Sequence, residues 1–301
     1  MIKNFTEFFT YALSIKGKSV VVVQPHNEET LAAVVEAAKV NLAEFHLVGN
    51  ESIIRQTLNL LGSSHHFHFY NEVETEKAIA KSFELIHNKT CDILMKGSVD
   101  TSTLMKSVFD PANSLRTGKL FSDVFIFETH KENKLLMITD GGLNLSPNLD
   151  EKISIIQNAI KVAHALGNTN PKVALLSASE KVNPKLQSSV DAAEITKLNR
   201  DGKITGCVID GPMALDVCVS EQAAAEKNIR SDVAGNAEII VAPNIEAANS
   251  LAKSTQYFAG LPHAQVIVGG KIPILIPSRA DKCEEKVRTI ALGVIMSSAN
   301  D

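Results

Sequence analysis

The 301-residue sequence has only four cysteines, and no two of them form the CxxC spacing that is typical of zinc sites and redox motifs. They are Cys91, Cys207, Cys218 and Cys283. Scattered cysteines fit reduced thiols in a cytosolic protein better than a disulfide framework. We expect the first three, which lie within or beside apolar segments, to be buried core residues. Cys283 differs because an arginine and a predicted helix start nearby favour a lowered thiol pKa.

The sequence also lacks a block of positive charge and a long apolar run. It has 30 Lys and Arg against 34 Asp and Glu, which gives a net charge of -4. Without a basic stripe we expect no nucleic-acid partner. No stretch approaches the ~18 apolar residues of a membrane span, and the N-terminal segment lacks the apolar core and cleavage site of a signal peptide. We therefore expect a cytoplasmic protein without a membrane partner.

Several common site signatures are missing as well. GxGxxG, GxxxxGK[ST] and GxSxG do not occur, so the sequence has no fingerprint of a dinucleotide site, a P-loop or a hydrolase nucleophile elbow. Three histidines, His65, His66 and His68, stand close together, and the last two alternate with phenylalanines as residues on one side of a strand do. Because no carboxylate or cysteine accompanies them at ligand spacing, we predict no metal site there.

The sequence is instead rich in an alternation of two patterns. Short apolar runs recur along the chain, and segments with helical spacing of apolar residues lie between many of them. The runs cover residues 19–24, 45–49, 66–70, 91–95, 123–128, 135–139, 172–177, 206–210, 238–243, 265–270 and 272–276. Most are too short for helices and too continuously apolar for strands with one solvated face. This pattern predicts an α/β protein whose mainly parallel sheet is covered by helices on both faces.

The middle of the chain departs from this alternation. A short polar link at residues 130–133 joins the runs 123–128 and 135–139 and leaves no room for a crossover helix. We predict an antiparallel strand pair there, and we expect one α/β unit to end and the next to begin near this pair. The expected organisation is two packed α/β lobes with a cleft between them.

Ligands of a parallel sheet bind beyond the carboxyl ends of its strands, so residues that follow each apolar run are candidates for a binding site. Small, hydroxyl and amide groups dominate these positions, and such loops let backbone N–H groups approach an anion. Ordinary turn and capping chemistry is the alternative interpretation. The candidates for substrate binding are Lys96, Gly97, Ser98, Thr101, Asn144, Ser177, Asp210, Gly211 and Pro212.

The stretch IPSRADK, residues 276–282, places an arginine where an ordinary turn residue would suffice. Apolar residues at helical spacing predict a helix from about residue 282. Asp281 would then be its N-cap and Glu284 would stand three residues later, the arrangement of a capping box. Glu285 points away from the apolar side of this helix, where it is either a free carboxylate or a solvated partner of Arg288.

Arg279 lies between a strand end and a helix start. A guanidinium beside unpaired N–H groups makes a fork-shaped receptor for phosphate. With a carboxylate one turn into the helix, the chemistry suggested is an oxyanion held by the cation while the carboxylate moves a proton.

Beyond these single residues, a set of segments resembles the phosphotransacylases, the family of phosphate acetyltransferases and phosphate butyryltransferases. In chain order they are KGSVDTSTLMK, TDGGLNLSPN, VALLSASEK, VIDGPMALD, DVAGNAEIIVAPNIEAANSLAK and IPSRADK. The resemblance covers roughly residues 90–298, and the first 90 residues are similar only in pattern. Its combination of DGP followed by Asp216, the VAGNAEIIVAPNIEAAN block, and Ser-Arg after the last strand is specific.

The resemblance implies a fold similar to that of isocitrate and isopropylmalate dehydrogenases, with two α/β lobes, a site in the cleft and usually a homodimer. It implies that the last strand and helix return to the N-terminal lobe. We therefore expect residues 1–128 and 265–301 to form the first lobe and residues 129–264 the second. Such enzymes convert acyl-CoA and inorganic phosphate reversibly to acyl phosphate and CoA, without a metal, a cofactor or a covalent intermediate.

The resemblance also assigns roles to single residues. Arg279 would hold phosphate or acyl phosphate, and Ser278 would polarise the thioester carbonyl. An acid six residues past the arginine takes the thiol proton of CoA in the acetyl enzymes, and that count leads to Glu285. This chain has glutamate where aspartate is usual, and Ala-Asp-Lys where the acetyl enzymes have Gly-Cys after Ser-Arg. Glu284 and Asp281 are therefore alternatives for the acid.

Further alternatives concern the substrate and the class of protein. The family's second arginine is matched only by Lys106 or, more distantly, by Arg116. The loop and the chain length look more like the butyryl branch, so butyryl-CoA is favoured over acetyl-CoA. A non-catalytic acyl-CoA sensor is an alternative, as is a metal-dependent dehydrogenase of the same fold, which only fold likeness supports. Its metal ligands would be the loop acids Asp140, Asp210 and Asp216.

Overall fold

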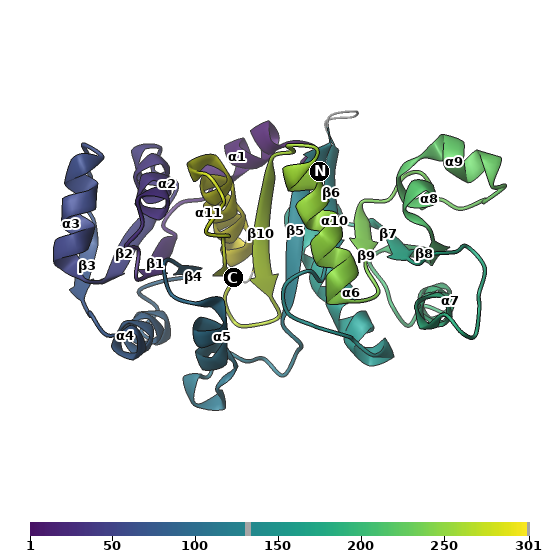
Figure 1. The fold of residues 1–301 in the computed structure, drawn as a ribbon, viewed down its shortest axis with the longest axis horizontal. Coiled ribbons are helices and arrows are strands. Elements are labelled where there is room, and N and C mark those ends of the chain that lie inside the picture. The colour runs from purple at the N-terminus through teal and green to yellow at the C-terminus, as the bar shows by residue number, and fades with distance from the viewer. Residues whose placement is uncertain (130–133, 300–301) are drawn as a thin grey trace. The chain divides into compact units, whose positions relative to one another are not determined.

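The computed structural model describes residues 1–129 and 134–299, so the predicted polar link at 130–133 lies outside the described residues. The chain forms two compact units. Residues 5–119 and 263–301 make up the first unit, and residues 1–4 and 120–262 make up the second. Figure 1 labels the elements of both. Within the described residues, no helix combines the length and the apolar character that crossing a membrane requires.

The first unit is built on strands in the order β3-β2-β1-β4-β11-β10. Its strands are β1 (Ser19–Val23), β2 (Glu44–Gly49), β3 (His68–Asn71), β4 (Ile93–Lys96), β10 (His263–Val268) and β11 (Ile274–Leu275). They are parallel except for β10, which runs antiparallel to β11. All five residues of β1 are buried, as expected for a central strand with a helix layer on each face.

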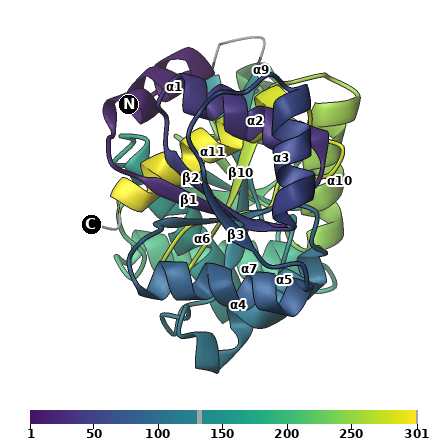
Figure 2. The same cartoon turned by 90° about the vertical axis from the view of Figure 1, so that its left-hand side faces the viewer.

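Helices cover both faces of this part of the sheet, with α2 and α3 on one side and α4 and α5 on the other (Figure 2). The helices of the first unit are α1 (Phe5–Ser14), α2 (Glu28–Lys39), α3 (Glu51–Leu60), α4 (Thr75–His87), α5 (Thr101–Phe109), the short 3-10 helix η1 (Pro111–Asn113) and α11 (Cys283–Ser298). Helix α11 packs against α1, α2 and β10. The last helix therefore belongs to the unit that contains the N-terminal strands.

The second unit has the strand order β5-β6-β9-β7-β8. Its strands are β5 (Ser122–Thr129), β6 (Lys134–Thr139), β7 (Lys172–Leu176), β8 (Val208–Met213) and β9 (Ile239–Val241). Its helices are α6 (Leu149–Ala165), α7 (Gln187–Arg200), α8 (Leu215–Val219), α9 (Glu221–Glu226) and α10 (Ile245–Tyr257). A buried apolar cluster joins the strands to α8, α9 and α10 and includes Phe125, Ile138, Met213, Val217, Ala224 and Ala248.

The predicted α/β class and all eleven predicted strands are confirmed, with boundaries that shift by a few residues. The antiparallel pair is confirmed as β5 and β6. Because β5 pairs with β6, residues 120–128 lie in the second unit, whereas the sequence-based division assigned them to the first. The predicted run 206–210 continues to Met213, so Asp210, Gly211 and Pro212 lie within β8 and not in a loop after it.

Candidate active site

Two neighbouring strands of the first unit bring the predicted anion-binding residues to one edge of the sheet. Leu94 and Met95 of β4 pair in parallel with Ile274 and Leu275 of β11, so the two strands end side by side. Lys96 is the last residue of β4, and the loop with Ser278 and Arg279 follows β11. The carboxyl ends of parallel strands are where ligands bind in such sheets.

Lys96 is buried at this edge, with 4% of its surface exposed. Its Nζ donates to the carbonyl oxygens of Gly97 (3.2 Å) and Val99 (3.3 Å). Burial lowers the pKa of Lys96, and the positive charges of Arg279 and Lys286 lower it further. The charges of Arg279 and Lys286 thus reach Lys96, and we call these three residues the cation cluster.

Arg279 is available for a ligand. Its guanidinium donates to a carboxylate oxygen of Asp100 at 2.5 Å, but the two side chains are 68% and 71% exposed. An exposed ion pair of this kind contributes little to stability and is readily exchanged for another anion. Asp100 is the N-cap of α5 and makes no side-chain capping hydrogen bond, which leaves Thr101 and the first turn of the helix facing solvent.

Gly97 and Ser98 fasten the loop after β4 to β1. The N–H of Gly97 donates to Val23 (2.9 Å) and that of Ser98 donates to Gln24 (2.7 Å). A Cβ on Gly97 would lie 2.4 Å from the carbonyl oxygen of Gln24, so only glycine fits. The Ser98 hydroxyl accepts from Asn27 Nδ2 at 3.1 Å. Both N–H groups are thus engaged within the protein, and the expectation that they approach an anion is wrong.

Two buried side chains, Asp281 and Lys286, hold the loop after β11 by hydrogen bonds. The sequence analysis predicted a different role for Asp281 and did not consider Lys286. Asp281 is 3% exposed; its Oδ2 accepts from the N–H of Ser278 (2.7 Å) and its Oδ1 lies 3.5 Å from His263 Nε2. Lys286, which is also buried, donates from Nζ to the carbonyl oxygens of Ser278 (3.1 Å) and Asp281. The backbone on either side of Arg279 is therefore held in place.

The predicted capping box of Asp281 and Glu284 is wrong. The N-cap of α11 is Lys282, without a side-chain capping hydrogen bond, because Asp281 turns inward to the N–H of Ser278. Glu284 is 78% exposed and lies 3.8 Å from Arg288. The predicted lowering of the Cys283 thiol pKa is also wrong, because burial raises this pKa and the nearby Glu36 raises it further.

Glu285 lies in the first turn of α11 with 16% of its side chain exposed. Its Oε1 is 3.6 Å from Arg288 Nη1, the partner that the sequence suggested, but the predicted solvated position of Glu285 is wrong. Its Oε2 is buried and has no hydrogen-bond partner within the described part of the chain. A buried carboxylate oxygen without a donor is unusual and sets Glu285 apart from Glu284, whose side chain is exposed.

The two candidates for a second family arginine are both exposed. Lys106 lies in the last turn of α5, more than one turn along the helix from Asp100. Arg116 follows η1, and its backbone forms an isolated bridge with Gly270. Lys286 was missed, although a signal was available: it stands four residues before the apolar Ile290 and so lies on the buried side of α11.

In the second unit, Asn144 is tied to a buried carboxylate. Asp140 accepts from the N–H groups of Gly142 (2.9 Å), Leu143 (3.1 Å) and Asn144 (3.2 Å). The side-chain nitrogen of Asn144 donates to Asp140 and to the carbonyl oxygen of Phe121 (2.8 Å). The backbone and side-chain nitrogens of Asn144 therefore hold this loop in place by hydrogen bonds.

A second carboxylate lies beside Asp140. Burial raises the pKa of Asp123 to about 8, and the neighbouring charge of Asp140 contributes to this shift. Burial also raises the pKa of Asp140, but its hydrogen bonds oppose the shift. The raised pKa favours the protonated form of Asp123.

The three acids that a dehydrogenase would need do not come together as a metal-ligand group among the described residues. Asp210 accepts from Arg200 (3.2 Å) and from the N–H of Gly211 (2.9 Å). Asp216 lies 2.9 Å from Lys227. The geometry gives no support to a metal-dependent dehydrogenase.

Ser177 belongs to an open groove of the second unit with a volume of about 1440 Å³. Its hydroxyl lies 2.9 Å from that of Ser188, and its N–H donates to Met213 (2.8 Å). The apolar part of the lining includes Leu176, Val182, Leu186, Leu215 and Pro243. Asp210, Gly211 and Pro212 do not line it. Gly211 is needed for packing, since a Cβ there would lie 2.7 Å from Leu175 Cβ.

The lining of this groove includes a buried ion pair, Lys152 and Asp191. Lys152 Nζ lies 2.6 Å from Asp191 Oδ2, and both side chains are 9% exposed. Gln187 donates to the other carboxylate oxygen at 2.7 Å. The pair links α6 to α7 and places a buried pair of opposite charges in the lining of the groove.

Comparison with known proteins agrees with the resemblance inferred from the sequence. A sequence model of the phosphate acetyl/butaryl transferase family matches residues 66–294. A phosphate butyryltransferase from Clostridium acetobutylicum is 41% identical over 298 residues, which cover 99% of each chain. A phosphate acetyltransferase from Thermotoga maritima is 38% identical over 282 residues, which cover 94% of this chain and 96% of that one.

Solved structures give the same result for the fold. A branched-chain phosphotransacylase from Enterococcus faecalis V583 matches with a TM-score of 0.83 and 28% identity, covering 93% of this chain and 99% of that one. A phosphotransacetylase from Streptococcus pyogenes, at 20% identity and a TM-score of 0.80, supports the fold alone. The predicted fold class is confirmed. The chain belongs to the phosphate acetyl/butaryl transferase family.

Proposed function

We propose that the protein transfers a short-chain acyl group reversibly between coenzyme A and inorganic phosphate, with butyryl-CoA as the favoured substrate. Family membership supports the reaction class, and the 41% identity to a phosphate butyryltransferase supports the choice of acyl group. The structural observation that carries the proposal is the cation cluster of Lys96, Arg279 and Lys286 at the ends of β4 and β11.

The cation cluster explains how a phosphate would bind. The positive charges of Arg279 and Lys286 lie close enough to lower the pKa of Lys96, and of these three residues only Arg279 is exposed. A phosphate that replaces Asp100 on the guanidinium gains a bidentate, charge-assisted contact. It also lies near the first turn of α5, whose N–H groups and dipole favour an anion.

The reaction requires two further contributions from the protein. One group must polarise the carbonyl of the acyl thioester, and another must transfer the proton of the CoA thiol. In acyl phosphate formation, an oxygen of hydrogen phosphate attacks the thioester carbonyl carbon, the C–S bond breaks, and the proton that the phosphate loses is transferred to the CoA sulfur. We assign phosphate to Arg279, carbonyl polarisation to Ser278 and proton transfer to Glu285, which has a buried oxygen without a hydrogen-bond donor. Asp281 is better suited to hold Ser278 in place than to move a proton, because it is buried beneath the loop.

The reaction is tested by measuring CoA release from acetyl-, propionyl-, butyryl- and longer acyl-CoA with and without phosphate. We expect release that depends on phosphate and is fastest with butyryl-CoA. Faster turnover of acetyl-CoA would replace the butyryl assignment with the phosphate acetyltransferase alternative. Acyl-CoA binding without any release would replace the enzyme with a sensor.

The assignment of the acid predicts different results for three carboxylates. Glu285→Gln should lower kcat by ~100-fold, the lower end of the range for proton transfer, with little change in thermal unfolding. Glu284→Gln should behave like the wild type, because its carboxylate is exposed. Asp281→Asn should lower the free energy of unfolding by ~1–3 kcal/mol, because it disturbs a buried hydrogen-bonded group.

These three variants are measured together by steady-state kinetics and thermal unfolding. If Asp281→Asn alone loses activity, and by more than its loss of stability explains, Asp281 is the acid and the assignment to Glu285 is wrong. A loss confined to Glu284→Gln would point to the exposed carboxylate instead.

The remaining parts of the proposal concern the surroundings of the reaction. We propose that it proceeds without a metal ion or an additional cofactor, in the cytoplasm, in a homodimer that has no nucleic-acid partner. Turnover that survives a chelator supports the first point, and light scattering of the purified protein measures the oligomer. Loss of turnover in chelator, restored by Mg²⁺ or Mn²⁺, would contradict the proposal that the reaction needs no metal ion.

A further inference from the structure

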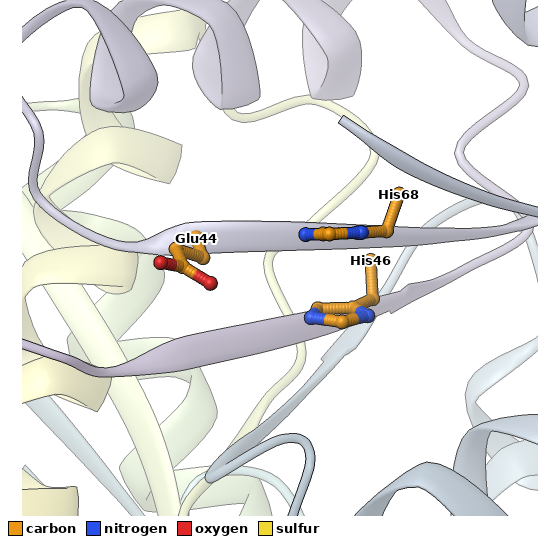
Figure 3. A group of neighbouring side chains, drawn as sticks. All are labelled: Glu44, His46 and His68. Carbon is orange, nitrogen blue, oxygen red and sulfur yellow. The ribbon is translucent and has the colours of Figure 1, made fainter. Parts of the chain in front are cut away.

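Three side chains on the sheet of the first unit bring metal-binding atoms close together. His46 of β2 is the register partner of His68 of β3, and Glu44 stands two residues before His46 on the same face of the strand. The two imidazole rings are stacked, with centroids 4.4 Å apart and planes 15° apart. Figure 3 shows the Glu44 carboxylate beside the same end of both rings. One ligand atom from each residue lies within 4.8 Å of the other two.

His46 is the fixed member of this group. It is 4% exposed, and its Nδ1 lies 3.0 Å from the hydroxyl of Tyr70. When Nδ1–H donates to the Tyr70 oxygen, the tautomer is set and the Nε2 lone pair is available. A neutral, oriented imidazole is what a metal ion requires of a histidine ligand.

His68 and Glu44 are the adjustable members, since both are exposed. A tetrahedral ion with bonds of ~2.0–2.2 Å needs ligand atoms roughly 3.3–3.5 Å apart, so these two side chains must close in by about 1–1.5 Å. Stacked rings direct their lone pairs in parallel, and His68 must also tilt toward His46. An exposed side chain makes such changes by rotating about χ1 and χ2, without any backbone movement.

We propose that Glu44, His46 and His68 form a binding site for a divalent transition-metal ion, with Zn²⁺ as its first candidate. Two imidazoles and one carboxylate match the ligand preferences of Zn²⁺, Cu²⁺ and Ni²⁺, whereas Mg²⁺ and Ca²⁺ prefer oxygen ligands alone. Water would occupy the fourth position on the exposed side. The sequence analysis considered His68 together with His65 and His66 and predicted no metal site, because Glu44 and His46 reach His68 only through the pairing of β2 with β3.

The site is separate from the proposed active site. Glu44 opens β2, whereas Lys96 closes β4, so within the first unit the two sites lie toward opposite ends of parallel strands. β3 is the last strand in the order on this side and pairs with β2. An ion held by both strands would fasten this edge strand to the sheet, so the effect of the ion is structural and turnover should not depend on it.

The test is a titration of the untagged, chelator-treated protein with Zn²⁺ by calorimetry, together with a thermal unfolding series. We expect one Zn²⁺ per chain and a rise in the unfolding temperature of the wild type. In His68→Gln we expect at least ~10-fold weaker binding and no rise in the unfolding temperature, because even outer-shell losses weaken metal sites by ~10–100-fold. Glu44→Gln, a second exposed position, should weaken binding in the same way.

His65→Gln is the matched control, because His65 is also exposed but lies outside the group of three. It should bind Zn²⁺ like the wild type. A Cu²⁺ spectrum by electron paramagnetic resonance should show two coordinated nitrogens in the wild type and one in His68→Gln. A wild type that binds no Zn²⁺, or a His68→Gln variant that binds it as tightly as the wild type, would overturn the proposal.

Discussion

Arg279→Ala is expected to lower kcat for phosphate-dependent CoA release by at least ~100-fold, the loss that follows removal of one preorganised donor to a developing oxyanion. The fold should be unaffected, because the Arg279 side chain is 68% exposed and its ion pair with Asp100 is equally exposed. Steady-state kinetics with varied phosphate and thermal unfolding of the same preparation measure the two effects separately.

Two further variants define what Arg279 contributes. Arg279→Lys keeps the charge but loses the planar fork, so we expect it to recover only part of the lost activity. Arg55→Ala removes another exposed arginine that pairs with a carboxylate, Glu51, in the same unit, and it should leave kcat unchanged. Near-normal turnover of folded Arg279→Ala would remove this residue from the phosphate site.

Much of the fold could be predicted from local sequence patterns, each of which spans only a few residues. The strands β1 and β7 were found because short, continuously apolar runs between turn residues fit buried parallel strands. The pair β5 and β6 was found because a four-residue link excludes a crossover helix. The position of Arg279 followed from the same reasoning, since strand ends of a parallel sheet gather at one edge.

The errors arose where a side chain chooses between a local and a distant partner. Asp281 fits the local pattern of an N-cap, yet its carboxylate accepts from the N–H of Ser278 and faces His263, which is far away in the sequence. Glu44 and His46 have no visible relation to His68 until β2 pairs with β3. Strand register is set by long-range packing, so contacts of this kind are invisible to local patterns.

The hydrogen bonds from the N–H groups of Gly97 and Ser98 to β1 and Gln24 were also not predicted, because they too depend on contacts between distant parts of the chain. A small residue followed by a hydroxyl after a strand fits both an anion loop and a loop that packs closely on a neighbouring strand. The sequence cannot distinguish them, because the deciding atoms are the carbonyl oxygens of Val23 and Gln24. The cation cluster, and not the backbone of this loop, is therefore the stronger candidate for the phosphate.

Lys152→Ala is expected to lower the free energy of unfolding by about 3–5 kcal/mol, because it leaves a buried carboxylate without its counter-charge. Asp191 is 9% exposed and would keep only the hydrogen bond from Gln187. Denaturant unfolding followed by circular dichroism measures the loss.

The matched control is Lys39→Ala, which breaks an ion pair with Glu36 at 2.7 Å whose side chains are 50% and 52% exposed. It should cost less than about 1 kcal/mol. The double variant Lys152→Met with Asp191→Leu should be much closer to the wild type than Lys152→Ala, because no unpaired charge remains in the interior. A loss below about 1 kcal/mol in Lys152→Ala would mean that Asp191 reaches water or takes up a proton. The ion pair would then contribute to the polarity of the groove and not to the stability of the fold.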